Sequence, residues 1–413
     1  MLRRTTLAFA VAGLTVVVFA QPPAPAPLLE VVARSPQLEA ARRRIDAARA
    51  RTDAAGRLAD PEVGAMGSRV NADAGGENRD MWELSLRQPL PKRGERAADR
   101  ERAQAVVRMA EAEFAMIAGD LAGDVAMTLA EAEGADARAR LIDAQLARLG
   151  AVLQSIEARL AAGTATRIAD RLTVQSRVAS LQLQLEQTQR AAADARATVR
   201  GRLALAPQSP VPAFTAPTDT DINPTDAATL AFATARIAEA NAMGKMARAS
   251  ANPMTSVGVR FERERSSMGN QDTVGLAFSS EIPWRNRRYS RAEARAAESD
   301  RAAAQADATA ARHRIASAVS RVERAEHVAT TARRLAGETQ ARLDAEHEAL
   351  NRAVSVGAGP GMGGESAVLH AVDILDKTTE TQLQIIEAET SARVTRAELW
   401  RYVPARQLLH LFP

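Results

Sequence analysis

Apolar side chains recur at helical spacing along two very long stretches of this chain. In residues 92–162, which contain no proline, one run of apolar residues advances by alternating steps of four and three positions. The run consists of Ile142, Leu146, Leu149, Leu153, Ile156 and Leu160. Such steps form the heptad seam of a coiled coil. At about 1.5 Å per residue, the stretch predicts a single helix roughly 105 Å long.

The second half of the chain predicts an equally long helix at residues 285–356. Shorter helical segments lie before and after the long helix in each half. The segment that follows Gly163 has its own seam, formed by Val174, Val178, Leu181 and Leu185. We therefore expect each long helix to lie beside two shorter helices placed end to end. A rod of this length exceeds the dimensions of a compact domain.

Four short segments instead alternate apolar and polar residues with the period of β-strands. They lie at about 62–70, 81–89, 254–263 and 273–282. Polar, glycine-bearing loops at 71–80 and 264–272 join them in pairs, and we expect both loops to be exposed to solvent. One apolar face per strand suits a membrane barrel, and a sheet packed on a soluble core is the alternative. Four strands cannot close a water-filled barrel, so the membrane interpretation requires several chains.

The chain repeats itself at an offset of about 192 residues. Residues 88–93 (QPLPKR) and 280–285 (SEIPWR) each end an alternating segment and begin a long helical one. A proline-rich stretch at 206–224 separates the two copies. The sequence therefore predicts a first repeat at 21–205 and a second repeat at 225–413.

Residues 1–20 have the three parts of a secretory signal peptide: two arginines, an apolar run and small residues around Ala20. No later segment has a continuous apolar stretch of spanning length, so entry into a membrane would require β-strands. The sequence contains no cysteine. Disulfides, thiolate metal sites and a cysteine-linked lipid are therefore excluded from the printed chain.

Charge and candidate chemistry narrow the functional class further. The formal net charge is +4, from 54 basic and 50 acidic side chains of interleaved sign. A nucleic-acid partner would require a basic stripe with aromatic residues between the charges, so we expect none. The five histidines form no helical ligand pair, and no nucleophile has a base beside it. The sequence predicts no catalytic residue, cofactor or metal site, and no enzymatic activity.

Three motifs carry a resemblance to a known family. They are residues 88–91 (QPLP), residues 160–163 (LAAG) and residues 371–379 (AVDILDKTT). The chain resembles the TolC-like outer-membrane efflux proteins, which are the outer membrane factors of tripartite efflux systems. This resemblance implies a mainly α fold with a small β part, built from two tandem repeats. It further implies a homotrimer, with a twelve-stranded β-barrel in the outer membrane and an α-helical barrel that extends into the periplasm.

The resemblance also implies a pore gate. Asp373 and Asp376 match acidic positions that point into the tunnel near its closed end, so three chains would form two acidic rings. Residues three apart share one helix face, and a ring of carboxylates attracts cations. The alternative is a pair of solvated helix charges. Leu369 and His370 occupy the place where the family has a basic residue, so we expect a different or weaker latch for the closed state.

Two further sets of residues follow from the resemblance. The turns that contact the adaptor would include Gly163, Arg167, Asp170, Gly357 and Gly364. The family's acid in the first turn is replaced by Ala169, with Asp170 shifted by one position, and residues 357–364 make the second turn longer than in the family. Trp82 and Trp284 would lie at the membrane interface, because tryptophan is enriched there.

The sequence thus predicts the outer-membrane channel of a tripartite efflux system, a passive exit duct for small molecules or metal ions. Its partners would be outer-membrane lipid, a periplasmic adaptor protein and an inner-membrane transporter of the resistance-nodulation-division type. The alternative hypothesis is a soluble periplasmic coiled-coil adaptor or scaffold without a pore. An adaptor would have one helical hairpin and several strand-rich domains, whereas this chain predicts two hairpins and few strands.

Overall fold

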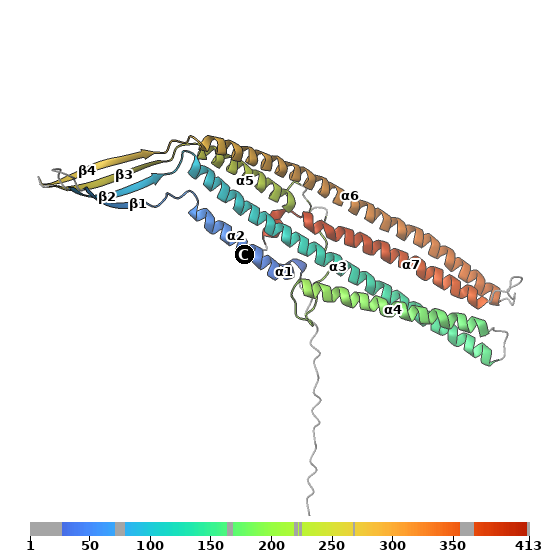
Figure 1. Ribbon diagram of the computed structural model, residues 1–413. Coiled ribbons are helices and arrows are strands. Elements are labelled where there is room, and N and C mark those ends of the chain that lie inside the picture. Colours follow the sequence, from blue (N-terminus) through green and yellow to red (C-terminus); the bar gives the residue numbers. More distant parts are fainter. Residues whose placement is uncertain are drawn as a thin grey trace, which may run out of the picture.

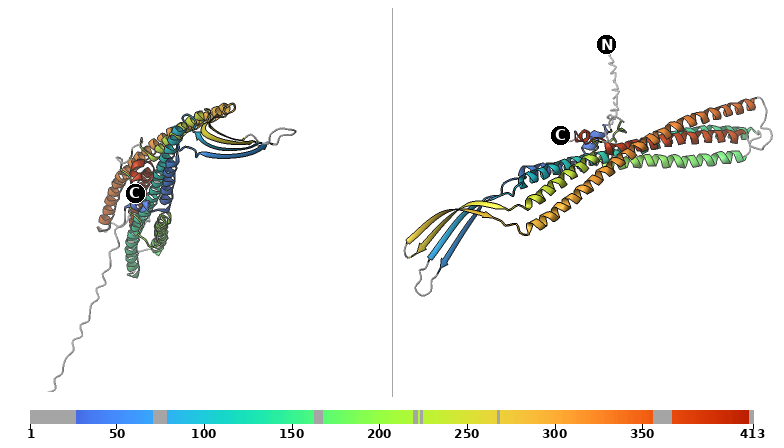
Figure 2. Two further views of the ribbon diagram at one scale, coloured as in Figure 1. Left: turned by 90° about the vertical axis from the view of Figure 1, so that its left-hand side faces the viewer. Right: turned by 90° about the horizontal axis from the view of Figure 1, so that it is seen from above.

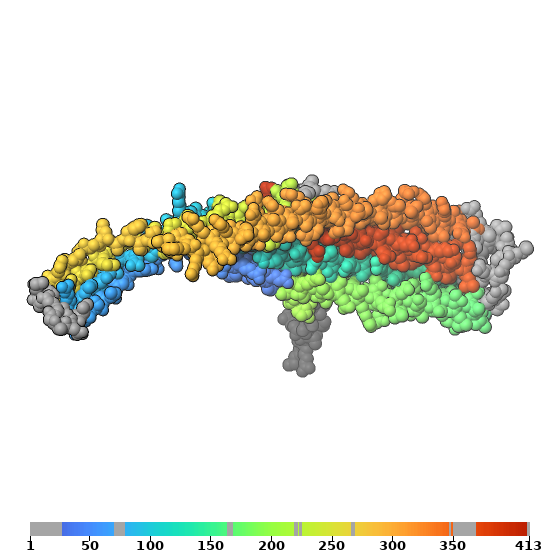
Figure 3. All heavy atoms as spheres, turned by 45° about the horizontal axis from the view of Figure 1, so that its top comes forward, coloured from blue at the N-terminus to red at the C-terminus, as the bar shows by residue number. Residues whose placement is uncertain are grey.

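The computed structural model describes residues 27–70, 79–162, 168–218, 222, 225–266, 269–355 and 367–410. The predicted signal peptide at 1–20 lies outside these ranges. The described chain is a long, curved rod with strands at one end and helix tips at the other (Figures 1 and 3). None of the described helices is both long enough and apolar enough to cross a bilayer.

Each half of the chain supplies two strands and one long helix with shorter helices around it. The first half contains α1 (Leu28–Ala33), α2 (Pro36–Ala54), β1 (Glu62–Val70), β2 (Arg79–Leu90), α3 (Glu95–Ala161) and α4 (Ile168–Arg202). The second half contains α5 (Ala228–Ser250), β3 (Thr255–Ser266), β4 (Gly269–Ser280), α6 (Asn286–Ser355), α7 (Ala367–Ala397), the 3-10 helix η2 (Glu398–Tyr402) and α8 (Ala405–Leu409).

The two long helices have 67 and 70 residues, and each lies beside two shorter helices. Helix α3 contacts α2 and α4, and α6 contacts α5 and α7, with the shorter partners end to end along the rod (Figures 1 and 2). The expected pairing of one long helix with two shorter ones is confirmed. Contacts of α3 with α5 and α7 join the two halves side by side.

The main apolar core lies in the middle of the rod, where α3 is rich in alanine and glycine. Phe114, Leu121 and Val125 of α3 pack there against Leu28 of α1 and Leu408 of α8. Small residues on α3 let neighbouring backbones approach closely. The end of the chain, through Leu408, therefore completes this core.

The proline-rich segment after α4 packs on the same region and is not a free linker. Trp400 donates its indole N–H to the carbonyl of Thr215 at 3.0 Å, and Arg396 donates to the carbonyl of Pro217 at 3.3 Å. The guanidinium of Arg393 lies 4.3 Å from the ring centroid of Phe214. These contacts hold the segment that joins the halves against η2 and the end of α7.

Two glycines of α3 should respond in opposite ways to alanine. A Cβ atom at Gly119 would lie 2.7 Å from the Trp400 carbonyl oxygen, a backbone atom that cannot move aside easily, whereas one at Gly150 would meet nothing within 4 Å. We expect Gly119→Ala to destabilise the protein by about 1–3 kcal/mol through overpacking. Gly150→Ala should stabilise it by up to about 1 kcal/mol, because alanine is the better helix former.

Urea titration followed by circular dichroism measures both changes. Equal effects of the two substitutions would show that α3 does not approach the backbone of η2 as closely as the structure has it.

The four strands form one antiparallel sheet in the order β1-β2-β3-β4. The outer strands, β1 and β4, each pair on one side only. Residues 71–78 of the first expected loop lie outside the described residues. The expectation of a loop at 264–272 is wrong, because β3 continues to Ser266 and β4 begins at Gly269. Polar residues extend these strands because they pair across them, as Arg263 does with Asp272 at 2.7 Å.

Side chains of the sheet divide into an apolar face and a polar face. Leu84, Phe261 and Val274 are direct neighbours across three strands, and directly opposed residues of antiparallel strands share a face. This apolar face is uncovered: Leu276 is 92% exposed and Phe278 is 72% exposed. We call it the outer face; it comprises Val63, Ala65, Trp82, Leu84, Leu86, Val257, Val259, Phe261, Val274, Leu276 and Phe278.

The opposite face of the sheet is charged and contains small residues. Arg260 on this face pairs with Glu83 at 2.9 Å, and Arg79 pairs with Glu264 at 3.2 Å. Gly64 and Gly275 are the two ends of the cross-strand row that contains Ser85 and Arg260. The separation of an apolar and a polar face follows the period-two pattern in the sequence.

Candidate functional site

The end of the rod opposite the sheet contains the predicted gate residues, and a second apolar cluster holds its helices together. Ile142, Leu149 and Ile156 of α3 are buried there against Val174 and Leu181 of α4, and Val372 of α7 completes the cluster. Leu146, Leu153, Leu160, Val178 and Leu185 pack partly buried around it. Both heptad seams are therefore confirmed. Val372 places α7, and with it the acidic motif, beside the α3–α4 pair.

Asp376 is held by two side chains from other helices. Arg177 of α4 donates from Nε to the Asp376 carboxylate, with distances of 3.1 Å to Oδ1 and 3.0 Å to Oδ2. Gln145 of α3 donates from Nε2 to Oδ1 at 3.4 Å. The pair is partly shielded from water, since the side chains of Arg177 and Asp376 are 38% and 27% exposed. This contact links the first half of the chain to the second across the repeat boundary.

Gln145 is a polar residue inside an apolar seam. Its side chain is buried, and its Oε1 has no hydrogen-bond partner in the part of the chain that the structure describes. A buried amide of this kind destabilises the seam unless it is paired, so its one bond to Asp376 favours the register in which α7 lies against α3.

Asp373 lies on a more solvated part of the same helix. Its carboxylate forms an ion pair with the ammonium of Lys377, four residues later, at 2.7 Å, and both side chains are more than half exposed. The hydrogen bond to Asp373 raises the pKa of the Lys377 ammonium above its usual value, and the charge of Glu346 adds to the effect. Next to it, His370 of α7 contacts Glu346 of α6 through Nε2 at 3.2 Å.

A hollow runs between α4 and α7 at this point. Its volume is about 600 Å³, and its lining residues are Leu172, Thr173, Ser176, Arg177, Ser180, Val372 and Asp376. The Arg177–Asp376 pair therefore lines a groove between the two helical hairpins. Separation of α4 from α7 would break this pair and release the carboxylate.

Of the residues predicted to contact an adaptor, only Asp170 lies within the described ranges. It is 2% exposed and lies in the first turn of α4, where a negative charge interacts favourably with the helix dipole. Gly163, Arg167, Gly357 and Gly364 lie outside the described residues. The role of these turns stays a prediction.

Trp82 and Trp284 lie toward opposite limits of the sheet's outer face. Trp82 belongs to β2 and lies directly opposite Arg263 of β3. At this level the apolar rows of the outer face end and charged residues begin. Trp284 follows β4 at the junction with α6. Their side chains are 68% and 83% exposed. About ten strand residues separate the levels of the two tryptophans. At about 3.3 Å per residue and a strand tilt of about 45° from the barrel axis, they give an apolar band roughly 23 Å high. This height is close to that of the apolar band of a membrane barrel.

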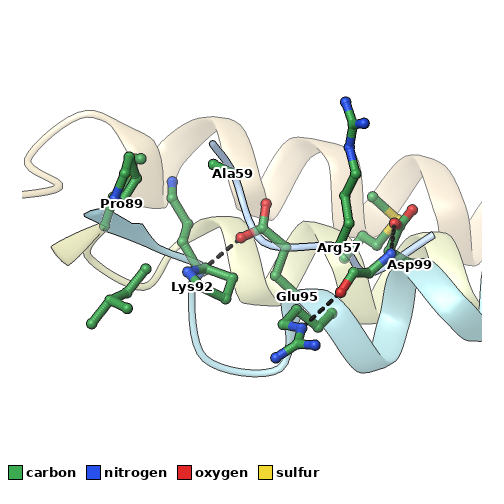
Figure 4. A pocket seen from close by; sticks show the side chains of 12 residues that line it. Arg57, Ala59, Pro89, Lys92, Glu95 and Asp99 are labelled. Atoms are coloured by element: carbon green, nitrogen blue, oxygen red, sulfur yellow. Dashed lines mark hydrogen bonds between the residues drawn. The ribbon is translucent and has the colours of Figure 1, made fainter. Parts of the chain in front are cut away.

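The first strand-to-helix junction encloses a pocket of about 360 Å³ (Figure 4). Glu95 accepts a hydrogen bond from the Lys92 backbone N–H at 2.8 Å and so fixes the start of α3. Asp99 accepts from the Gly56 N–H at 2.7 Å, and Arg96 donates to the Gly56 carbonyl at 2.7 Å. The charged groups of this pocket thus hold the end of α2 against α3, which favours a structural role.

Comparison with known proteins tests the resemblance that the sequence carries. The outer membrane efflux protein family model matches residues 28–204, which include the first strand pair and the first long hairpin. The resemblance to the TolC-like outer-membrane efflux proteins is therefore confirmed. The hypothesis of a soluble coiled-coil adaptor is wrong, because the matched family consists of outer-membrane channel components.

Solved structures share the fold of this chain over nearly its whole length. The outer membrane protein VceC from Vibrio cholerae is 16% identical with a TM-score of 0.68, and the match covers 93% of this chain and 94% of VceC. CusC is 13% identical with a TM-score of 0.69 and the same coverage, 93% and 94%. The open-state outer membrane channel MtrE from Neisseria gonorrhoeae is 16% identical with a TM-score of 0.60, covering 91% of this chain and 87% of MtrE. No curated protein sequence matches the chain.

The partners of Asp376 were not predicted from the sequence. Gln145 lies within the seam of α3 and Arg177 lies beside the seam of α4, so their heptad positions could have indicated polar groups at the core. Their bond to Asp376 depends on the contact between α7 and the α3–α4 pair, which no periodicity within one helix predicts. The expectation of a different or weaker latch, drawn from Leu369 and His370, stays a prediction.

Proposed function

We propose that this protein is the outer-membrane channel of a tripartite efflux system and that it works as a passive exit duct. The observation that carries the proposal is a family match together with an uncovered apolar sheet face at one end of a helical rod. The sheet would lie in the outer membrane, and the helices would extend into the periplasm. The family is one of passive channel components, so no chemical step is required of this chain.

The channel would be a homotrimer. A four-stranded sheet with two unpaired edges exposes backbone N–H and C=O groups, and such groups are very costly in lipid. Pairing of β4 in one copy with β1 in the next removes every edge. Three copies would supply twelve strands, which is enough to enclose a water-filled channel.

The gate would lie at the helix tips, where Asp373 and Asp376 form two acidic rings in the trimer. In the closed state Arg177 neutralises Asp376, and Lys377 pairs with Asp373. Opening would move α7 away from α4, break the Arg177–Asp376 pair and present the freed carboxylate to the pore. The ring would then attract cations more strongly when the channel is open than when it is closed.

The partners would be a periplasmic adaptor at the helix tips and an energy-coupled inner-membrane transporter. We propose a transporter of the resistance-nodulation-division type and a cargo of small molecules or metal ions. The compact strand-to-helix junction at residues 88–91 and the chain length support this choice over protein secretion.

Single-channel conductance in planar bilayers tests this function. We expect the detergent-purified protein to give small, cation-selective steps that a trivalent cation blocks. Asp373→Ala, which leaves the Arg177–Asp376 pair in place, should weaken the block at least several-fold without opening the channel. The Asp373→Ala, Asp376→Ala double variant should lose the block and conduct more.

A protein that stays soluble without detergent and gives no conductance would overturn the channel proposal. A double variant that is blocked as strongly as the parent would leave the channel intact and remove the acidic gate.

A further inference from the structure

The second strand-to-helix junction carries a cluster of exposed arginines. Arg285, Arg287 and Arg288 follow Trp284 directly, and Arg291 lies one turn further along α6. All four are exposed, and their guanidinium groups make no ion pair or hydrogen bond with the described part of the chain. We call these four residues the junction cluster. Like charges this close repel one another, so an anion bound between them would lower their electrostatic energy.

The first junction shows what basic residues do when they serve the fold. There Lys92 donates its ammonium to the Ser250 carbonyl at 3.1 Å, and Arg96 donates to the Gly56 carbonyl at 2.7 Å. The junction cluster makes no comparable contact, although it occupies the equivalent place in the second repeat. Its charges are therefore available to a partner.

The position of the cluster identifies the chemistry of that partner. The apolar outer face of β4 continues past the strand into Ile282 and Trp284, which are 69% and 83% exposed, and Tyr289 is 65% exposed between the arginines. Exposed tryptophan and tyrosine beside an apolar belt mark a membrane interface. Residues 286–291 rise by about 8 Å along the helix, which is close to the thickness of one headgroup layer.

We propose that the junction cluster binds the phosphate groups of anionic phospholipids in the periplasmic leaflet of the outer membrane. The proposal rests on the placement of the sheet in that membrane. Arginine suits this partner, because its planar guanidinium forms two parallel hydrogen bonds with a phosphate and is weakly hydrated. The cluster would fix the height of the channel in the bilayer at the level where the strands become helices.

Binding of short-chain dioctanoyl phosphatidylglycerol to the full chain in neutral detergent tests the proposal by calorimetry. We expect the parent to bind this lipid in preference to dioctanoyl phosphatidylcholine. Each arginine near an anionic surface contributes about fivefold in affinity, so the triple variant Arg285→Gln, Arg287→Gln, Arg288→Gln should lose roughly 100-fold. Substitution of the same three arginines by lysine keeps the charge, so this variant should lose much less affinity for the lipid.

The matched control is Arg301→Gln, Arg312→Gln, Arg314→Gln, which removes three exposed arginines from the same helix farther from the sheet. It should bind like the parent. Equal affinity of the glutamine triple variant and the parent would overturn the proposal. So would equal loss in the control, which would indicate bulk charge, or full competition by glycerol phosphate at equal concentration, which would indicate a site for soluble anions.

Conductance separates this proposal from the proposed function. A glutamine triple variant that conducts like the parent in a bilayer of neutral lipid is folded and assembled, so its loss of lipid affinity is specific. Absence of conductance in the parent would instead refute the channel.

Discussion

Arg177→Ala is expected to open the periplasmic end of the channel and raise its conductance in planar bilayers. The substitution removes the ion pair that joins α4 to Asp376 and keeps both acidic residues in place. A partly exposed pair contributes about 0.5–1 kcal/mol, and a trimer has three pairs that would break together. The equilibrium between closed and open channels should therefore shift by roughly 10- to 150-fold. Block by a trivalent cation should persist, because the rings remain.

Two controls make this result specific. Arg190→Ala removes an exposed pair with Glu186 within α4 itself and should leave the conductance unchanged. The exchange Arg177→Asp with Asp376→Arg restores a pair of opposite charges across the same helices and should return the channel toward the closed state. A leaky Arg190 variant, or an Arg177 variant that conducts like the parent, would show that the pair is not the latch.

Leu276→Arg is expected to prevent stable insertion of the protein into lipid vesicles. Leu276 lies midway along the outer face of β4 and is 92% exposed in the single chain. An arginine near the middle of a bilayer costs about 2–4 kcal/mol on the lipid face of a barrel, and a trimer would carry three. The folded fraction in phosphatidylcholine vesicles, measured by urea titration, should fall sharply.

Thr273→Arg provides the matched control on the same strand. Thr273 lies on the opposite face, directly across from Glu262, where an added positive charge meets an acidic side chain. We expect this variant to insert like the parent. If the sheet lay in water, Leu276→Arg would be as harmless as the control, because surface substitutions usually change stability by no more than about 0.5 kcal/mol.

Periodic features of the fold could be predicted from the sequence, because a heptad seam or an alternating strand encodes its own buried face. Leu149 and Val174 are buried where their seams placed them, and the alternation at Leu84 and Leu86 gave the outer face. The ends of the strands were harder to predict from the sequence. Asp272 was assigned to a loop at 264–272, yet it belongs to β4, where its carboxylate pairs with Arg263 of β3.

Features that depend on contacts between the repeats could not be predicted in this way. Trp400 belongs to a short 3-10 helix without any period, and its packing on α3 requires the glycine at position 119 of the other repeat. The Arg177–Asp376 bond has the same origin. A motif indicated that Asp376 was of interest, but only the arrangement of three helices reveals which cation it faces.

The two unpaired edges of the sheet would govern how the proposed trimer forms. The helical rod has its own core in a single chain. In contrast, β1 and β4 each form backbone hydrogen bonds with a neighbouring strand on one side only. In the proposed trimer, completion of the sheet is a reaction between molecules, so its rate depends on the local concentration of newly exported chains. A cell that makes too little of this protein would accumulate helical monomers in the periplasm, and their strand edges would be exposed to aggregation.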